Sequence, residues 1–150
     1  MCECKTFVKV SRDAIDLQEA ERFVLDDACG AIASFVGVTR RDIVDDRTVI
    51  GLEFEAHVPL AEAVLHDIVS SYRKRSESDL KHVYIHHRLG FVPVGSGNLV
   101  LAVSSPHRKT AFRAVEALME ELKSTLPVWK KEKFHDNSYR WSQNVEFTPS

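Results

Sequence analysis

Two groups of cationic residues in the second half of the chain have the types and spacing to bind and transform an anion. The first is the segment 104–108 (SSPHR), in which Ser105 is a good helix N-cap and Pro106 suits the first helical turn. The unpaired N–H groups at a helix N-terminus favour an anion there. Arg108 would add a forked contact to phosphate or carboxylate, and His107 a titratable donor. The alternative is that Arg108 pairs with a neighbouring acid while His107 only packs.

The second group is Lys123, near the end of the same predicted helix, followed by the run 130–133 (KKEK). In a strand, Lys130 and Glu132 share one face, while Lys131 and Lys133 share the other. A structural interpretation exists for each lysine. Lys123 would complement the helix dipole, and the strand lysines would protect an exposed edge from aggregation.

The local charge balance favours an anion-binding face. Residues 101–134 carry seven Lys or Arg against four Glu, whereas residues 11–27 carry six acids against two bases. The whole chain has 20 basic and 22 acidic residues, a net charge of −2, so no global field drives nucleic-acid binding. Arg40 comes just after a predicted strand, where a loop arginine could reach into a site.

Several other chemistries lack support. His86 and His87 are adjacent in a predicted strand, so they point to opposite faces and cannot chelate one metal together. A zinc or redox site at Cys2-x-Cys4 has no further ligand pattern to complete it. The segment 95–97 (GSG) lacks the third glycine and the helix of a dinucleotide-binding loop. We therefore expect no metal and no cofactor.

Composition points to one soluble domain over residues 1–150. The chain has 44% hydrophobic and 28% charged residues, and its longest apolar run is only 99–103 (LVLAV). The N-terminus has no apolar signal region, and three cysteines form no disulfide framework. We expect a cytosolic protein that binds neither a membrane nor nucleic acid.

Strands and helices alternate irregularly, with hairpins beside helices, which favours an α+β fold with mixed or antiparallel sheets and packed helices. The clearest helix begins at Ser105–Pro106 and ends before Pro127. Ser11 is expected to cap the first helix, Cys29–Val38 to be a buried strand and Arg40–Thr48 an exposed loop. The other expected elements are strands at Thr6–Val10, Val49–His57, His82–Leu89, Asn98–Ser104, Val128–Phe134 and Tyr139–Trp141, a helix from Pro59, and a turn at Gly90–Gly97.

Five motifs in one order resemble the large, catalytic subunit of molybdopterin synthase. The resemblance runs from about Phe7 to Trp141, nearly the whole chain. Its most specific parts are the SxHR pattern at 105–108 and the LKxxxPxWKxE pattern at 122–132. The others are CGA…FVGVTR at 29–40, LEFEA at 52–56 and HRLG at 87–90.

The resemblance implies an α/β hammerhead-type fold and a homodimeric core. A small ubiquitin-like subunit would dock at each end, its C-terminal Gly-Gly tail entering the site as a thiocarboxylate. The enzyme would transfer two sulfurs to cyclic pyranopterin monophosphate. By this likeness Arg40, His107 and Arg108 bind the substrate, and Lys123 and Lys130 are the catalytic pair. Lys131 and Glu132 line the same site.

One departure from the family pattern concerns the turn before Trp141, where a glycine is common and this chain has Asn137. Asparagine tolerates the left-handed conformation that glycine supplies there. The alternative function is a non-catalytic module that binds an acidic or ubiquitin-like partner tail through the same basic groove. Lysines at 123 and 130 favour the enzyme, because a docking groove would accept arginine at both positions. Whether Lys123 acts as a nucleophile or as an acid and base stays open.

Overall fold

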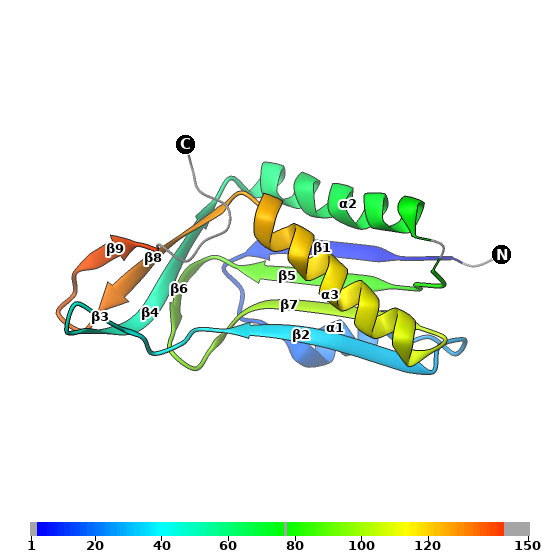
Figure 1. The fold of residues 1–150 in the computed structure, drawn as a ribbon, viewed down its shortest axis with the longest axis horizontal. Helices are drawn as coiled ribbons and strands as arrows, with labels where there is room; N and C mark the ends of the chain where they lie inside the picture. The colour runs from blue at the N-terminus through cyan, green and yellow to red at the C-terminus, as the bar shows by residue number, and fades with distance from the viewer. Residues whose placement is uncertain (1–2, 77, 143–150) are drawn as a thin grey trace.

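The computed structural model describes residues 3–76 and 78–142 and contains two sheets joined end to end (Figure 1). The first sheet has four strands in the order β1 (Thr6–Ser11), β5 (Val83–Arg88), β7 (Gly97–Ser105) and β2 (Ala31–Val38). Strand β1 is parallel to β5, and the other pairs are antiparallel. This mixed sheet with helices on both faces confirms the predicted α+β class.

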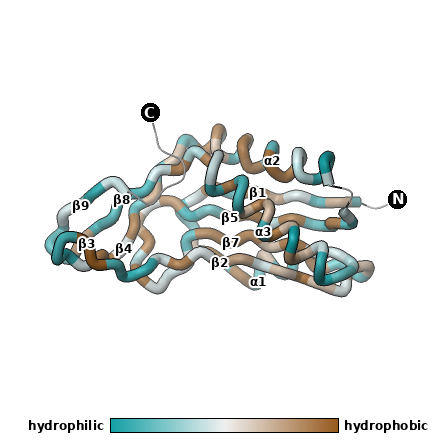
Figure 2. The backbone as a smooth tube through the Cα atoms, viewed as in Figure 1, coloured by the Kyte–Doolittle hydropathy of each residue, from teal (hydrophilic) through white to brown (hydrophobic). Residues whose placement is uncertain are grey.

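Helices α2 (Val58–Arg75) and α3 (Arg108–Thr125) cover one face of this sheet, and α1 (Leu17–Val24) covers the other. Hydrophobic residues follow the central strand β7 (Figure 2). Leu101 and Val103 pack with Leu65 of α2 and Leu118 of α3, all fully buried. Burying large aliphatic side chains is the main stabilising term, so α3 is held firmly against the sheet.

The second sheet extends from one end of the first. It consists of β3 (Ile43–Val44), β4 (Arg47–Ala56), β8 (Val128–Phe134) and β9 (Tyr139–Trp141), with β6 (Gly90–Pro93) paired to β4. Strand β8 begins three residues after α3 ends, so it leaves the helical layer directly. Through this connection, Lys123 at the end of α3 and Lys130 on β8 come to opposite sides of the junction between the sheets.

Both predicted serine caps are wrong. Helix α1 is capped by Asp16, whose Oδ1 accepts a hydrogen bond from Glu19 N at 3.1 Å, because Ser11 stays in β1 beside Arg88. Helix α3 begins at Arg108, and its N-cap is His107, which makes no side-chain capping bond. Ser105 still pairs with Ala31 in the sheet, and its hydroxyl donates to the carbonyl of His107 at 2.6 Å.

Three other segments differ from their expected form. The predicted loop 40–48 contains a hairpin between β3 and β4, whose turn has positive φ at Asp45 (51°) and Asp46 (63°). The predicted turn 90–97 contains strand β6. The predicted buried strand 29–38 begins at Ala31 and lies at the edge of its sheet, with several side chains exposed. Asn137 adopts the left-handed conformation (φ 68°), as predicted.

Candidate active site

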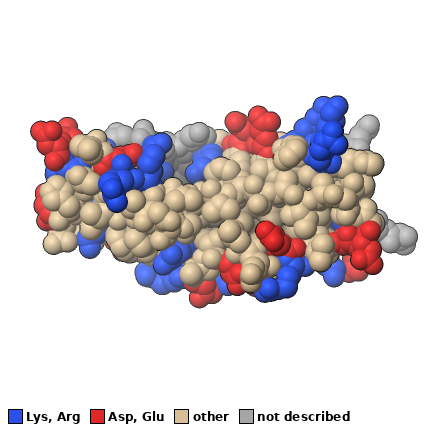
Figure 3. Space-filling view, turned by 90° about the horizontal axis from the view of Figure 1, so that it is seen from below, with Lys and Arg blue, Asp and Glu red and all other residues tan. Residues whose placement is uncertain are grey.

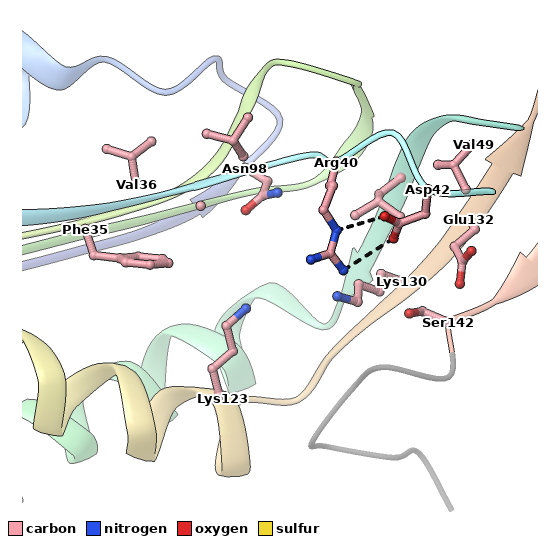
Figure 4. A pocket seen from close by; sticks show the side chains of 13 residues that line it. Phe35, Val36, Arg40, Asp42, Val49, Asn98, Lys123, Lys130, Glu132 and Ser142 are labelled. Atoms are coloured by element: carbon pink, nitrogen blue, oxygen red, sulfur yellow. Dashed lines mark hydrogen bonds and ion pairs between the residues drawn. The ribbon is translucent and has the colours of Figure 1, made fainter. Parts of the chain in front are cut away.

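A pocket of about 260 Å³ lies at the junction between the two sheets. Four of the predicted site residues line it: Arg40, Lys123, Lys130 and Glu132. The amino groups of the two lysines and the Arg40 guanidinium point toward the same space (Figure 4). Three cationic groups from three different parts of the chain therefore converge on one cavity.

Arg40 follows β2 and is oriented by Asp42. Its Nε donates to Asp42 Oδ1 at 2.8 Å, and a second nitrogen lies 3.4 Å from Oδ2. Asp42 also lines the pocket. Because both groups are well exposed, this ion pair is worth little in stability, but it holds the guanidinium in one orientation. The remaining nitrogen donors of Arg40 can face an anionic ligand.

The amine of Lys130 is perturbed by its surroundings in the pocket. Burial lowers its pKa below the usual 10.5, and the neighbouring charge of Lys123 lowers it further, against an opposing effect of Glu132. Burial and a like charge thus drive Lys130 toward the neutral amine. A neutral amine can take up a proton or attack an electrophilic carbon.

Glu132 is buried on the same face of β8 as Lys130. Its carboxylate is paired with Arg140 of β9, with 3.2 Å between Arg140 Nη2 and Glu132 Oε1. The backbone of Ser142, just after β9, donates to the carbonyl of Lys130 at 3.0 Å. These contacts fix the part of β8 that carries the lysine.

The structure does not bring Lys131 into the pocket. Its side chain lies on the opposite face of β8, where its Nζ is 3.3 Å from Glu55 Oε1 and 5.1 Å from the Trp141 ring centroid. The alternation of β8 predicted from the sequence places it there, apart from Lys130 and Glu132. The resemblance alone put it in the site.

His107 and Arg108 are also absent from the pocket of the same chain. Both are exposed at the start of α3, and Lys123 is near its end. Fifteen helical residues span about 22 Å, so Arg108 and Lys123 of one chain cannot contact one small ligand.

Sequence reasoning missed Asp42, Asn98 and Ser142 among the polar residues of the pocket. Asn98 is the extra residue of a bulge, where the pairing of β2 with β7 passes from Gly37–Leu99 to Val38–Gly97. Its Nδ2 donates to Thr39 Oγ1 at 3.3 Å. A side chain at position 37 would collide with Asn98, since a Cβ there would lie 2.6 Å from its Oδ1. Gly37, the glycine of the FVGVTR motif, was the sequence feature that could have indicated this close contact.

Two features are missing from the described part of the chain, a metal-binding cluster and a membrane-spanning helix. Within residues 3–76 and 78–142, no three His, Cys, Asp or Glu side chains gather where they could hold a metal ion. None of the helices in these ranges is long and apolar enough to cross a membrane.

Comparisons with known proteins identify the family. The family model described as "MoaE protein" matches residues 10–125. A molybdopterin synthase catalytic subunit of Aedes aegypti is 43% identical over 142 residues, covering 93% of this chain and 90% of that protein. The chain belongs to the MoaE family. Its relatives are named as catalytic subunits of molybdopterin synthase, an enzyme of molybdenum cofactor biosynthesis.

Solved structures show the same fold. Molybdopterin synthase from Staphylococcus aureus superimposes with a TM-score of 0.83 at 30% identity, covering 91% of this chain and 96% of that one. A complex of subunits 1 and 2 of molybdopterin-converting factor from Helicobacter pylori contains a chain that matches with a TM-score of 0.71 at 22% identity, covering 91% of this chain and 90% of that one. The predicted membership of the MoaE family and the predicted fold are confirmed.

Proposed function

We propose that this chain transfers sulfur from the thiocarboxylated C-terminus of a small ubiquitin-like subunit to cyclic pyranopterin monophosphate, forming molybdopterin. The observation that carries the proposal is the convergence of Arg40, Lys123 and Lys130 on one pocket of a MoaE-family chain. A thiocarboxylate and a phosphate are both anions. Fixed cations in a partly dry pocket stabilise such charges more strongly than water does.

The two lysines have separate tasks in this proposal. Lys130, whose pKa is lowered by burial, provides the neutral amine that accepts a proton or attacks the thioacyl carbon. Lys123 is exposed at the end of α3 and contributes positive charge to the anionic reactants. Arg40, oriented by Asp42, binds the phosphate or the tail carboxylate.

The proposed sulfur donor fits the size of the pocket. A cavity of about 260 Å³ accepts an extended Gly-Gly tail but not a folded domain. The body of the small subunit therefore remains outside while its tail enters. The Helicobacter pylori protein of the same fold was solved as a complex of two subunits, which supports a second, different subunit here. We place the reaction in the cytosol, because the three cysteines form no disulfide framework in the sequence.

We propose further that a second copy of this chain supplies His107 and Arg108 to the pocket. Strand β2 is an edge strand that carries no charged residue, and Ile32, Phe35 and Val38 are exposed on it. Seen from the side on which β2 lies, the molecule has a long uncharged band with charges around it (Figure 3). An exposed apolar edge strand is a ready template for a second copy.

The length of β2 supports this arrangement. Its Ala31 end lies beside the start of α3, where Gly30 N donates to the Pro106 carbonyl at 3.2 Å, and its Val38 end lines the pocket. These ends are about 23 Å apart. Antiparallel pairing of two β2 strands about a two-fold axis would bring the second copy's helix start beside this pocket.

Mixing two inactive variants tests the two-chain site. Arg108→Ala and Lys123→Ala chains each form dimers without an intact site, whereas a hybrid dimer would contain one site with neither substitution. Random mixing should then restore about one quarter of wild-type activity, because half of the dimers are hybrids with one active site each. No recovery from a mixture that forms hybrids would show that a second copy does not supply Arg108 to the pocket.

Reconstitution tests the function itself. The purified chain is mixed with a thiocarboxylated small subunit and cyclic pyranopterin monophosphate, and molybdopterin is measured. Product formation that requires all three components is expected. Tight binding of the small subunit without product would favour a docking module, and no binding would contradict both functions.

A further inference from the structure

Arg140 of β9 lies directly opposite Glu132 of β8 in the second sheet. The Glu132 side chain is only 7% exposed, and its Oε1 is 3.2 Å from Arg140 Nη2. Arg140 Nε is also buried and makes no hydrogen bond to any of the described residues. Burying such a donor without a partner is unfavourable, so the pairing with Glu132 is what retains the guanidinium at this place.

Lys130 lies two residues before Glu132 on the same face of β8, and both side chains line the pocket, so the negative charge of Glu132 acts on Lys130 as well as on Arg140. An ion pair formed fully with Glu132 would keep Lys130 protonated. A carboxylate already engaged by an arginine offers much less of its charge to a second cation. How firmly Arg140 engages the Glu132 carboxylate therefore affects how readily the lysine loses its proton.

We infer that Arg140 is a positioning residue for sulfur transfer, which holds the Glu132 carboxylate toward β9 and leaves the Lys130 amine able to give up its proton. This inference rests on the proposed function of the pocket. Arg140 is outside the pocket lining and acts only through Glu132. Neither the motifs nor the charge pattern of the sequence pointed to it.

The other charged or titratable groups near Lys130 do not replace this contact. Lys123 of α3 and Arg40 after β2 are cations that favour a neutral Lys130. His87 of β5 is buried, and burial lowers its pKa to about 4, so it carries no charge at neutral pH. Asp42 is engaged by Arg40 at 2.8 Å. Glu132 is thus the carboxylate that most favours the protonated form of Lys130.

Replacement of Arg140 by methionine tests the inference in the reconstituted complex. Methionine keeps much of the aliphatic length but removes the charge, so Glu132 is free to pair with Lys130. The ascending limb of the pH–rate profile should shift to higher pH by about one unit. At pH values on or below this limb, activity should be about tenfold lower than in the wild type. The pH–rate profile of Arg140→Lys, which keeps the positive charge, should lie closer to that of the wild type. An unchanged profile for Arg140→Met would overturn the inference.

Two comparisons separate this role from a structural one. Lys133→Met removes a cation from the opposite face of β8 and should leave the pH profile in place. In a Glu132→Gln background, Arg140→Met should shift the profile less than in the wild type, because only its direct charge effect remains. Equal shifts in both backgrounds would show that Arg140 does not act through Glu132.

A direct readout distinguishes failure of this inference from failure of the proposed function. The lysines are reductively methylated with ¹³C, and the Lys130 resonance is assigned by its absence from Lys130→Arg. Its titration is followed by NMR in wild-type and Arg140→Met complexes. A higher Lys130 pKa in Arg140→Met is expected whatever reaction the pocket performs. Equal pKa values would refute the inference even if molybdopterin is formed.

Discussion

His87 links the core of the first sheet to the pocket, and its titration should be visible in the stability of the protein. The ring packs edge-on against Phe54 with centroids 5.1 Å apart, and Nδ1 donates to the carbonyl of Arg88 at 3.0 Å. Burial lowers its pKa from 6.5 to about 4, and the charges of Lys123 and Lys130 act in the same direction. His87 is therefore neutral in the folded protein at any pH well above 4.

The size of the effect follows from the two pKa values. Between pH 6.5 and pH 4, His87 is protonated in the unfolded chain but not in the folded chain. The free energy of unfolding therefore falls as the pH falls through this range. Above pH 6.5 His87 is neutral in both states, and its contribution to the free energy of unfolding is fully retained. Lowering the pH from 7 to 4.5 should remove about 2.5 kcal/mol of unfolding free energy through this one residue.

Urea unfolding followed by circular dichroism at pH 7 and 4.5 measures this loss. His87→Gln retains an N–H donor but does not titrate, so it should lose about 2.5 kcal/mol less than wild type over the same interval. His66→Gln, which removes an exposed histidine of α2, is the matched control and should behave as wild type. An equal pH dependence in His87→Gln and wild type would refute the reasoning. If His87→Gln is too unstable to study, NMR titration of the His87 ring in the wild-type protein tests the same prediction, a pKa of about 4.

Three further predictions concern the pocket and its supporting turn. Lys130→Arg should lower kcat by about 100-fold or more, because a guanidinium does not lose its proton at accessible pH; a pH–rate profile like that of wild type would contradict this. Gly37→Ala should raise KM for the pterin substrate by displacing Asn98, which would lie 2.6 Å from the new Cβ; an unchanged KM would show that Asn98 does not contribute to binding. Asn137→Ala should cost about 1 kcal/mol of unfolding free energy, since φ is 68°, whereas Asn137→Gly should not; equal losses would mean that the conformation is unimportant.

The sequence predicted elements well where one local pattern decided the outcome. The alternation of β8 separated Lys130 and Glu132 from Lys131 and Lys133, and the structure confirms that separation. Proline and apolar spacing located α3 but not its first residue. Ser105 is a suitable cap by type, yet its pairing with Ala31 keeps it in the sheet. Tertiary pairing therefore overrode local preference at this helix start.

The rest of the site depends on contacts between distant segments. Asp42 reaches the pocket because a short hairpin follows Arg40, and Asn98 reaches it because a bulge interrupts the pairing of β2 with β7. Arg140 meets Glu132 only through the register of β9. Neither periodicity nor composition encodes these registers. The resemblance grouped His107 and Arg108 with Lys123, but the length of α3 separates them within one chain.

The measurement that most directly tests sulfur transfer in this pocket is single-turnover formation of molybdopterin by Lys123→Ala beside Lys133→Ala. Lys123 lines the pocket, and Lys133 lies on the opposite face of β8, above the Phe91 and Tyr139 rings. Both variants should bind the small subunit. Lys123→Ala should form no product above background, while Lys133→Ala should match wild type. Wild-type product formation by Lys123→Ala would contradict the assignment of the chemistry to this pocket.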